Sequence, residues 1–251
     1  MKEIKNVFYA GNNDARQTLD IYLPEAESFK IFIYFHGGGL KGGSKNGYGG
    51  KFAEYLTAHG ICVVSAEYRM YPEARYPDFI EDAASAVAWV KNNIGSYGKS
   101  LGIYVGGSSA GGYLSMMLCF DPRWLLPFGE LKIPVAGYFH NAGQPTAHFK
   151  VLKERGISSK RVIIDESAPL FHIGLEESYP PMHFVVSDND MKCRYEQTML
   201  VLATLRHFEY DEEKIGFTLF HGKHCEQNKT VDENGDNVLG KMMVEFVEKY
   251  R

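Results

Sequence analysis

The chain has 251 residues, 45% of them hydrophobic, and its 27 basic and 31 acidic residues give a formal net charge of −4. This size and apolar content are enough for one sizeable core, so we expect a single domain over residues 1–251. The charges form no long block of one sign, which argues against a nucleic-acid partner, and no apolar run is long enough to span a membrane.

Strands and helices are expected to alternate along the chain. Apolar runs rich in β-branched and aromatic residues predict strands at 7–9, 19–23, 30–35, 61–65, 101–105, 135–139, 182–186 and 216–220. Helical apolar spacing predicts helices at about 48–59, 77–93, 113–118, 195–208 and 237–250. This alternation is typical of an α/β fold, with a mostly parallel sheet and helices on both faces. The less regular, partly charged stretch 144–179 is interpreted as a helical insertion over the site, a cap or lid.

A glycine-rich turn follows the expected strand at 101–105. It reads Gly107-Ser108-Ser109-Ala110-Gly111, and only Ser109 has glycines both two positions before and two positions after it. Such a turn between a strand and a helix holds a serine in a strained conformation that exposes its hydroxyl group. The free N–H groups of the following helix point to the place where an oxyanion would form. The pattern also occurs by chance, so the interpretation of Ser109 as a nucleophile depends on finding its partners.

A serine nucleophile needs a histidine base, and the histidine needs a carboxylate that orients it. Candidates for both lie just past the ends of expected strands, where parallel α/β sheets have their sites. We favour His224 over His221 as the base, because His224 lies in the loop and can turn toward the serine. We favour Asp190 over Asp188 as the acid, because Asp190 lies deeper in its loop and Asp188 could cap the turn instead.

The glycines after the expected strand at 30–35 are candidates for binding the oxyanion. Gly37, Gly38 and Gly39 follow His36, and the absence of side chains lets their N–H groups approach a negatively charged oxygen. The N–H group of Ala110, next to the nucleophile, would add another donor. A merely flexible glycine loop is the alternative interpretation.

The sequence shows no pattern typical of a targeting signal or of a metal site. The N-terminal residues contain no apolar core of signal-peptide length, which favours a cytoplasmic location. The four cysteines are scattered and show no Cys-x-x-Cys spacing, so we expect neither a disulfide framework nor a metal site.

Taken together, these motifs resemble those of α/β-hydrolases in the esterase/lipase group, which includes hormone-sensitive lipase-like and feruloyl- or acetyl-esterase-like enzymes. The matching residues cover most of the chain from about 30 to 225 and lie at 36–39, 67–69, 72–73, 107–112, 190 and 224. The resemblance implies an eight-stranded sheet, a triad of Ser109, Asp190 and His224, and no cofactor. It also implies an oxyanion hole formed by Gly37, Gly38 and Ala110.

The acid of this group stands at the end of a Gly-x-x-Asp loop, which supports Asp190 over Asp188. The chain departs from the group at three positions, where Ser187 replaces the glycine of that loop, Ser108 replaces an acidic residue and Leu40 replaces an aromatic one. These differences concern the acyl pocket and the substrate, not the class of reaction.

The expected function is hydrolysis of small, short-chain acyl esters through an acyl-enzyme intermediate. The short chain is expected because 144–179 offers only a modest cap, and its polar patch at 150–155 does not resemble a lipid-docking face. An amidase or arylformamidase using the same triad is the first alternative. A non-catalytic binding module is less favoured, because all three triad positions have candidates. The sequence does not indicate an oligomeric state.

Overall fold

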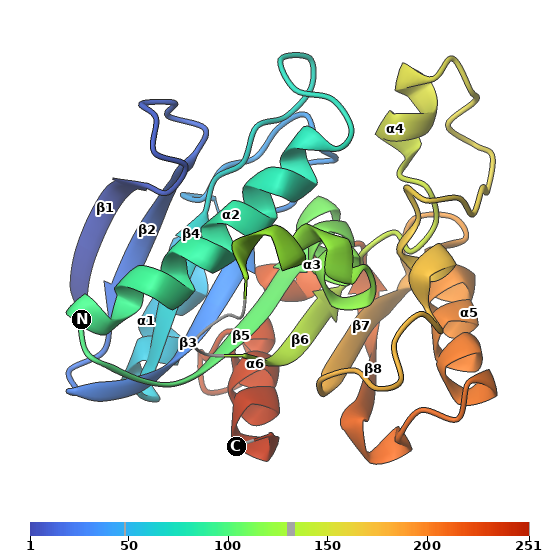
Figure 1. The fold of residues 1–251 in the computed structure, drawn as a ribbon. Helices are drawn as coiled ribbons and strands as arrows, with labels where there is room; N and C mark the ends of the chain where they lie inside the picture. The colour runs from blue at the N-terminus through green and yellow to red at the C-terminus, as the bar shows by residue number, and fades with distance from the viewer. Residues whose placement is uncertain (48, 130–133, 251) are drawn as a thin grey trace.

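The computed structural model describes residues 1–47, 49–129 and 134–250. In this part of the chain, eight strands form one sheet in the order β1-β2-β4-β3-β5-β6-β7-β8 (Figure 1). The strands are β1 (Lys2–Phe8), β2 (Thr18–Leu23), β3 (Ser28–Phe35), β4 (Ile61–Ala66), β5 (Lys99–Ser108), β6 (Val135–Asn141), β7 (Met182–Asn189) and β8 (Ile215–Lys223). The α-helices are α1 (Gly49–Ala58), α2 (Asp78–Asn93), α3 (Ala110–Phe120), α4 (Phe149–Glu154), α5 (Arg194–His207) and α6 (Val238–Lys249).

The strands from β3 to β8 run parallel to their neighbours, whereas β2 pairs antiparallel with both β1 and β4. This topology confirms the predicted eight-stranded, mostly parallel sheet. Parallel neighbours need crossover connections, and helices lie in the connections from β3 to β4, from β4 to β5 and from β5 to β6. The carboxyl ends of the parallel strands therefore meet at one edge, where their loops bring together residues that are far apart in the sequence.

Each predicted strand is present, and β1, β5 and β8 differ most in length from the prediction. Strand β1 begins at Lys2 because it pairs through its backbone with β2 at the edge of the sheet, and its mostly exposed side chains form no apolar run. Strand β5 continues through glycines that carry no strand signal. At Gly106 a Cβ atom would lie 2.8 Å from the ring of Phe32, so close packing requires the glycine. The predicted start of α1 at residue 48 lies outside the described residues.

Helices cover both faces of the sheet (Figure 1). Side chains along β3 alternate between two buried clusters, as the two-residue repeat of a strand dictates. Ile31 and Ile33 belong to the cluster that includes residues of α2, α3 and α5. Phe32 and Tyr34 belong to the cluster that includes residues of α1 and α6. The sheet is thus buried on both sides, which explains its nearly continuous apolar strands.

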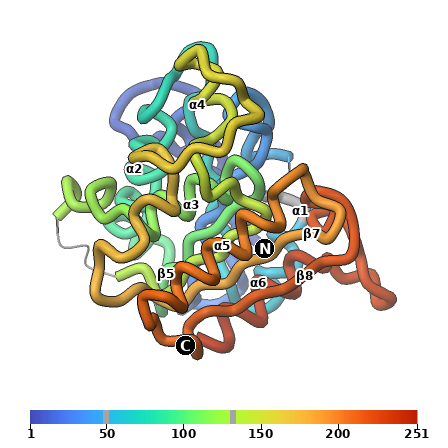
Figure 2. The backbone as a smooth tube through the Cα atoms, turned by 90° about the vertical axis from the view of Figure 1, so that its right-hand side faces the viewer, coloured from blue at the N-terminus to red at the C-terminus, as the bar shows by residue number. Residues whose placement is uncertain are grey.

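The segment 144–179 contains less helix than the sequence predicted. It holds the six-residue helix α4 and a 3₁₀ turn at Pro169–His172, and the rest has no regular secondary structure. Figures 1 and 2 show α4 projecting beyond the sheet. The hydroxyl of Tyr71 donates to Glu154 at 2.5 Å, and that of Tyr113 donates to the carbonyl of Ser167 at 2.8 Å. The segment is therefore tied to the body of the protein, and its role as a cap stays a prediction. Among the described residues, no helix has the length and hydropathy needed to cross a bilayer.

Candidate active site

Ser109 stands on the turn between β5 and α3, in a backbone conformation with φ 56° and ψ −110°. Its N–H group donates to the carbonyl of Asn141 at 2.8 Å. The end of β3 packs so closely on this turn that a Cβ atom at Gly107 would lie 2.5 Å from the carbonyl oxygen of Phe35, and one at Gly111 only 1.9 Å from it. Both glycines are therefore needed sterically, as the pattern around Ser109 predicted.

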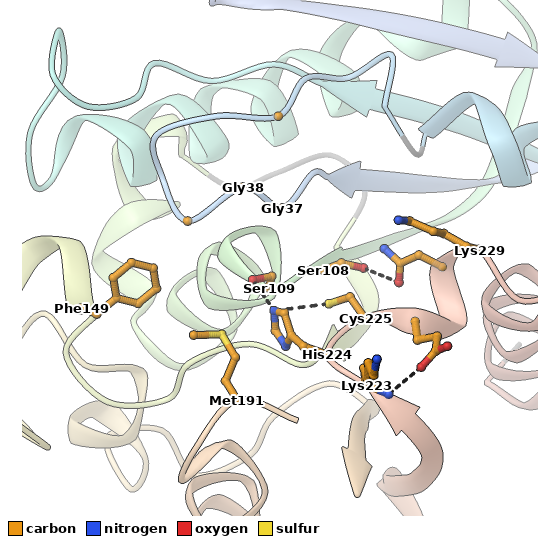
Figure 3. Close-up of a pocket in the computed structure, with 14 residues that line it drawn as sticks. Gly37, Gly38, Ser108, Ser109, Phe149, Met191, Lys223, His224, Cys225 and Lys229 are labelled. Atoms are coloured by element: carbon orange, nitrogen blue, oxygen red, sulfur yellow. Dashed lines mark hydrogen bonds between the residues drawn. The ribbon is translucent and has the colours of Figure 1, made fainter. Parts of the chain in front are cut away.

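The structure brings Ser109, His224 and Asp190 together from the loops after β5, β8 and β7. The Nε2 atom of His224 lies 2.8 Å from the Oγ atom of Ser109 (Figure 3). Its Nδ1 atom lies 2.5 Å from Oδ1 of Asp190. A carboxylate at Nδ1 fixes the proton on that nitrogen, which leaves Nε2 free to accept the proton of the serine hydroxyl. This is the arrangement that activates a serine nucleophile.

Asp190 is held by the turn that follows β7. Its side chain is 1% exposed, and its two carboxylate oxygens accept the N–H groups of Met191 at 2.7 Å and Ser187 at 3.3 Å. The buried guanidinium of Arg194 also lies near, and it donates to the carbonyl of Ala142 at 2.5 Å. Burial lowers the pKa of Arg194, and the nearby Asp190 carboxylate opposes that effect.

The two residues that the sequence left as alternatives bind each other. Nδ1 of His221 lies 2.7 Å from the carboxylate of Asp188, which also accepts the N–H group of Gly222 at 3.0 Å. The hydrogen bond from His221 is the largest cause that lowers the pKa of Asp188. The His221 side chain is 85% exposed, so this second pair joins the ends of β7 and β8 at the surface. The choice of Asp190 and His224 as neighbours of Ser109 therefore agrees with the geometry.

The glycine turn after β3 lies directly against the serine turn. A Cβ atom at Gly37 would lie 3.3 Å from the Cβ of Ser109, and one at Gly38 would lie 1.9 Å from the carbonyl oxygen of Gly42. Gly38 has φ +127°, which L side chains rarely adopt. Ala110 is the first residue of α3, and the first N–H groups of a helix have no partner within the helix. Gly37 and Ala110 thus lie next to Ser109 from two segments, and their role as oxyanion donors stays a prediction.

The stretch after β4 supports the glycine turn, a role that the sequence pattern did not specify. The ring of His36 stacks on Tyr68 with 4.4 Å between ring centroids, and the Tyr68 hydroxyl donates to the His36 carbonyl at 2.8 Å. The two ring nitrogens of His36 lie 2.7 Å from the carbonyl of Gly37 and 3.3 Å from Glu67. Burial alone would raise the pKa of Glu67, but hydrogen bonds, led by that of His36, hold it below its usual value.

A pocket of about 730 Å³ opens at Ser109 and His224 (Figure 3). Glycines and polar residues form most of its wall, and Phe149 and Met191 supply its large apolar side chains. Cys225 also lines the pocket, with its Sγ atom 3.7 Å from Nε2 of His224. Burial raises the pKa of the Cys225 thiol to about 12, so it stays protonated at neutral pH. In the described residues no group of three or more His, Cys, Asp or Glu is arranged to hold a metal ion.

Sequence reasoning missed the buried polar residues beneath this pocket. Asn141, Gln227 and Asn228 are each at most 1% exposed, and the side chain of Asn141 is hydrogen-bonded to both of the others. Asn141 ends β6 at the edge of the sheet where the site lies, and this position was the signal that could have identified it.

Comparisons with known proteins identify esterases that are similar to this chain. Residues 19–123 match the family model described as BD-FAE. Esterase LipI of Mycobacterium tuberculosis is 36% identical over 101 residues, which are 40% of this chain and 32% of LipI. Esterase LipC of the same organism is 33% identical over 216 residues, which are 77% of this chain and 53% of LipC. The chain thus spans about a third to a half of the length of these relatives.

Among solved structures, esterase B from Lactobacillus rhamnosis has a TM-score of 0.77 and 17% identity, and the match covers 99% of this chain and 86% of esterase B. Esterase B has also been solved with a tributyrin phosphonate inhibitor. At this identity the similarity demonstrates the fold, which is that of the α/β-hydrolases.

Proposed function

We propose that this chain, an α/β-hydrolase of the esterase/lipase group, is a serine carboxylesterase that acts on small esters with short acyl chains. The observation that carries the proposal is the continuous series of hydrogen bonds from Ser109 through His224 to Asp190. The esterase names of the relatives LipI and LipC support the same class of reaction.

In the proposed reaction, Ser109 Oγ attacks the ester carbonyl while His224 Nε2 takes its proton. The carbonyl oxygen becomes negative, and the N–H groups of Gly37, Gly38 and Ala110 are the donors available to stabilise it. Each such donor is worth roughly 3–4 kcal/mol in the transition state. His224 then gives its proton to the leaving alcohol, and an acyl group remains on Ser109. A water molecule then gives a proton to His224 Nε2 and attacks the acyl carbon. The bond between that carbon and Ser109 Oγ breaks, His224 returns the proton to Oγ, and the carboxylic acid leaves. Asp190 stabilises the imidazolium of His224 in both acylation and deacylation.

The pocket wall supports a preference for short acyl chains. A buried methylene group contributes about 0.8 kcal/mol only where apolar surface receives it. Phe149 and Met191 are the large apolar side chains of the wall, and glycines and polar residues make up most of the rest. We expect an acyl chain to gain most of its burial against these two side chains and less beyond them.

The first test uses a fluorophosphonate, which labels an activated serine. We expect the wild-type chain to be labelled and Ser109→Ala to lose the label, whereas Ser108→Ala keeps it. If Ser108→Ala loses the label and Ser109→Ala keeps it, then the nucleophile is Ser108 and the assignment of Ser109 is wrong.

The second test measures kcat/KM on p-nitrophenyl esters of increasing acyl length, beside formylkynurenine and emulsified long-chain triglyceride. We expect a maximum between acetyl and butyryl esters. A maximum on the formamide would favour an arylformamidase instead, and turnover that rises at the onset of emulsion would favour a lipase.

A further inference from the structure

Strand β6 contributes none of the three residues in the proposed triad, yet its last residue contacts the loops of two of them. The main-chain carbonyl of Asn141 accepts the N–H group of Ser109 at 2.8 Å. Its side-chain Nδ2 donates to Oγ of Ser108 at 2.7 Å and to Oδ1 of Asn228 at 2.8 Å. Both hydrogens of one amide group are thus used, one toward the nucleophile turn and one toward the histidine loop.

The histidine loop returns to the same side chain. Immediately after His224, the chain makes a 3₁₀ turn at Glu226–Asn228, and the side chain of Gln227 donates to Oδ1 of Asn141. Asn228 also accepts a longer hydrogen bond of 3.4 Å from Ser108, drawn as a dashed line from Ser108 in Figure 3. The loop that carries His224 is therefore attached to β6 through two consecutive side chains.

Further contacts complete a buried network. The hydroxyl of Tyr34 donates to Oγ of Ser108 at 2.9 Å. Ser187, at the end of β7, donates to the carbonyl of Lys223 at 2.9 Å, just before His224. The side chains of the network are almost completely buried. Buried polar groups of this kind are costly unless each is hydrogen-bonded, and a fully satisfied network is rigid.

Rigidity between these two loops matters for the distance from Ser109 Oγ to His224 Nε2, which is 2.8 Å. Misplacement of reacting groups by about 1 Å can cost roughly 10²-fold in rate. We propose that Asn141 is a positioning residue that holds the nucleophile turn and the histidine loop in register, with Gln227 as its partner on the loop. The inference rests on the proposed serine-hydrolase function and extends it to residues outside the triad.

The test compares Gln227→Met, which keeps the side-chain length but removes the amide, with Asn141→Leu. Each should lower kcat by about 10- to 100-fold with KM changed by less than about twofold, because the loss falls on the alignment of Ser109 and His224. In the double variant, the fold loss of kcat should be smaller than the product of the two single losses, because both substitutions remove the same contact. Gln227→Met keeps the proposal testable if Asn141→Leu does not fold.

Ser115→Ala is the matched control. Ser115 is completely buried and hydrogen-bonded, with its Oγ atom 2.8 Å from Nδ1 of His140 and 3.0 Å from the carbonyl of Gly112. Its loss should lower the melting temperature while kcat stays within about twofold. If the role of Asn141 is purely structural, Gln227→Met should likewise lower the melting temperature and leave kcat within about twofold. That result would overturn the proposal.

Fluorophosphonate labelling rates separate this inference from the proposed function. A wild-type chain that is labelled but hydrolyses none of the esters would refute the carboxylesterase function alone. In that case, slower labelling of Gln227→Met than of Ser115→Ala would still support Asn141 as a positioning residue, and equal rates would overturn it. A wild-type chain that is not labelled at all would overturn both.

Discussion

Replacing Gly38 by alanine is the sharpest test of the proposed oxyanion site. The backbone of Gly38 has φ +127°, and a Cβ atom there would lie 1.9 Å from the carbonyl oxygen of Gly42 and 2.4 Å from its carbonyl carbon. These contacts are with backbone atoms, so no side-chain rotation can relieve them. The turn at Gly37 and Gly38, whose N–H groups we propose as oxyanion donors, must therefore move.

The size of the effect follows from the donor that is displaced. Losing one oxyanion donor costs roughly 3–4 kcal/mol in the transition state, so kcat should fall by about 10²- to 10³-fold. KM should change little, because the donor acts on the tetrahedral intermediate and not on the bound ester. The assay is steady-state hydrolysis of p-nitrophenyl butyrate, with thermal unfolding of the same samples as a measure of stability.

Gly60→Ala is the matched control for this experiment. Gly60 also has a positive φ, of +72°, but a Cβ atom there would meet nothing within 4 Å. It should cost about 1–2 kcal/mol of stability from the left-handed backbone and leave kcat unchanged. If Gly38→Ala folds and keeps kcat within about threefold of the wild type, then this turn does not stabilise the oxyanion and the assignment of Gly38 is wrong.

Three further predictions concern the acid, the pocket wall and the response to pH. Asp190→Asn should lower kcat by about 10³- to 10⁴-fold, because it favours the wrong tautomer of His224, whereas Asp188→Asn should leave kcat within about twofold. If steady-state kinetics give the opposite ranking, then Asp188 is the acid that orients the histidine. Phe149→Ala should lower kcat/KM for butyryl esters by about tenfold, because it removes an apolar side chain from the pocket wall. If the dependence of kcat/KM on acyl length does not change, then the segment 144–179 does not form part of the acyl site. Burial lowers the pKa of His140 from 6.5 to about 3. Since the unfolded chain then binds the proton more tightly, stability should fall by up to about 1.4 kcal/mol per pH unit as the pH drops from 6.5 toward 3. His140→Asn, which cannot titrate, should reduce this slope in denaturant unfolding at several pH values, and an unchanged slope would mean that other groups cause the acid loss.

The sequence was most informative where the chemistry is local. Gly107 and Gly111 mark the serine turn because the backbones that meet there leave no room for a Cβ atom, and this constraint is visible within five residues. The alternation of apolar strands with amphipathic helices likewise predicted the parallel sheet, since each element buries its own face. The length of β1 was predicted too short, because an edge strand is held by backbone pairing and its side chains need not form an apolar pattern.

The choice between Asp188 and Asp190 depended on the end of β7. Asp188 still belongs to the strand and pairs with His221 on the neighbouring strand β8, at the surface. Asp190 has left the strand, and the turn directs its carboxylate inward, where it is 1% exposed. The sequence alone favoured Asp190 by its depth in the loop and by family resemblance, but only the pairing of β7 with β8 explains why both aspartates have a histidine partner and one pair is exposed.

By itself, then, the sequence determined the fold class, the nucleophile candidate and the set of residues at the strand ends, because these follow from local backbone geometry and from the burial of each element. The tertiary structure alone decided which loops meet. Asn141 and Gln227 are 86 residues apart along the chain, and their contact depends on β6 and β8 both lying next to β7 in the sheet. Strand order is set by packing between distant segments, so no pattern within one segment could have revealed this support beneath the site.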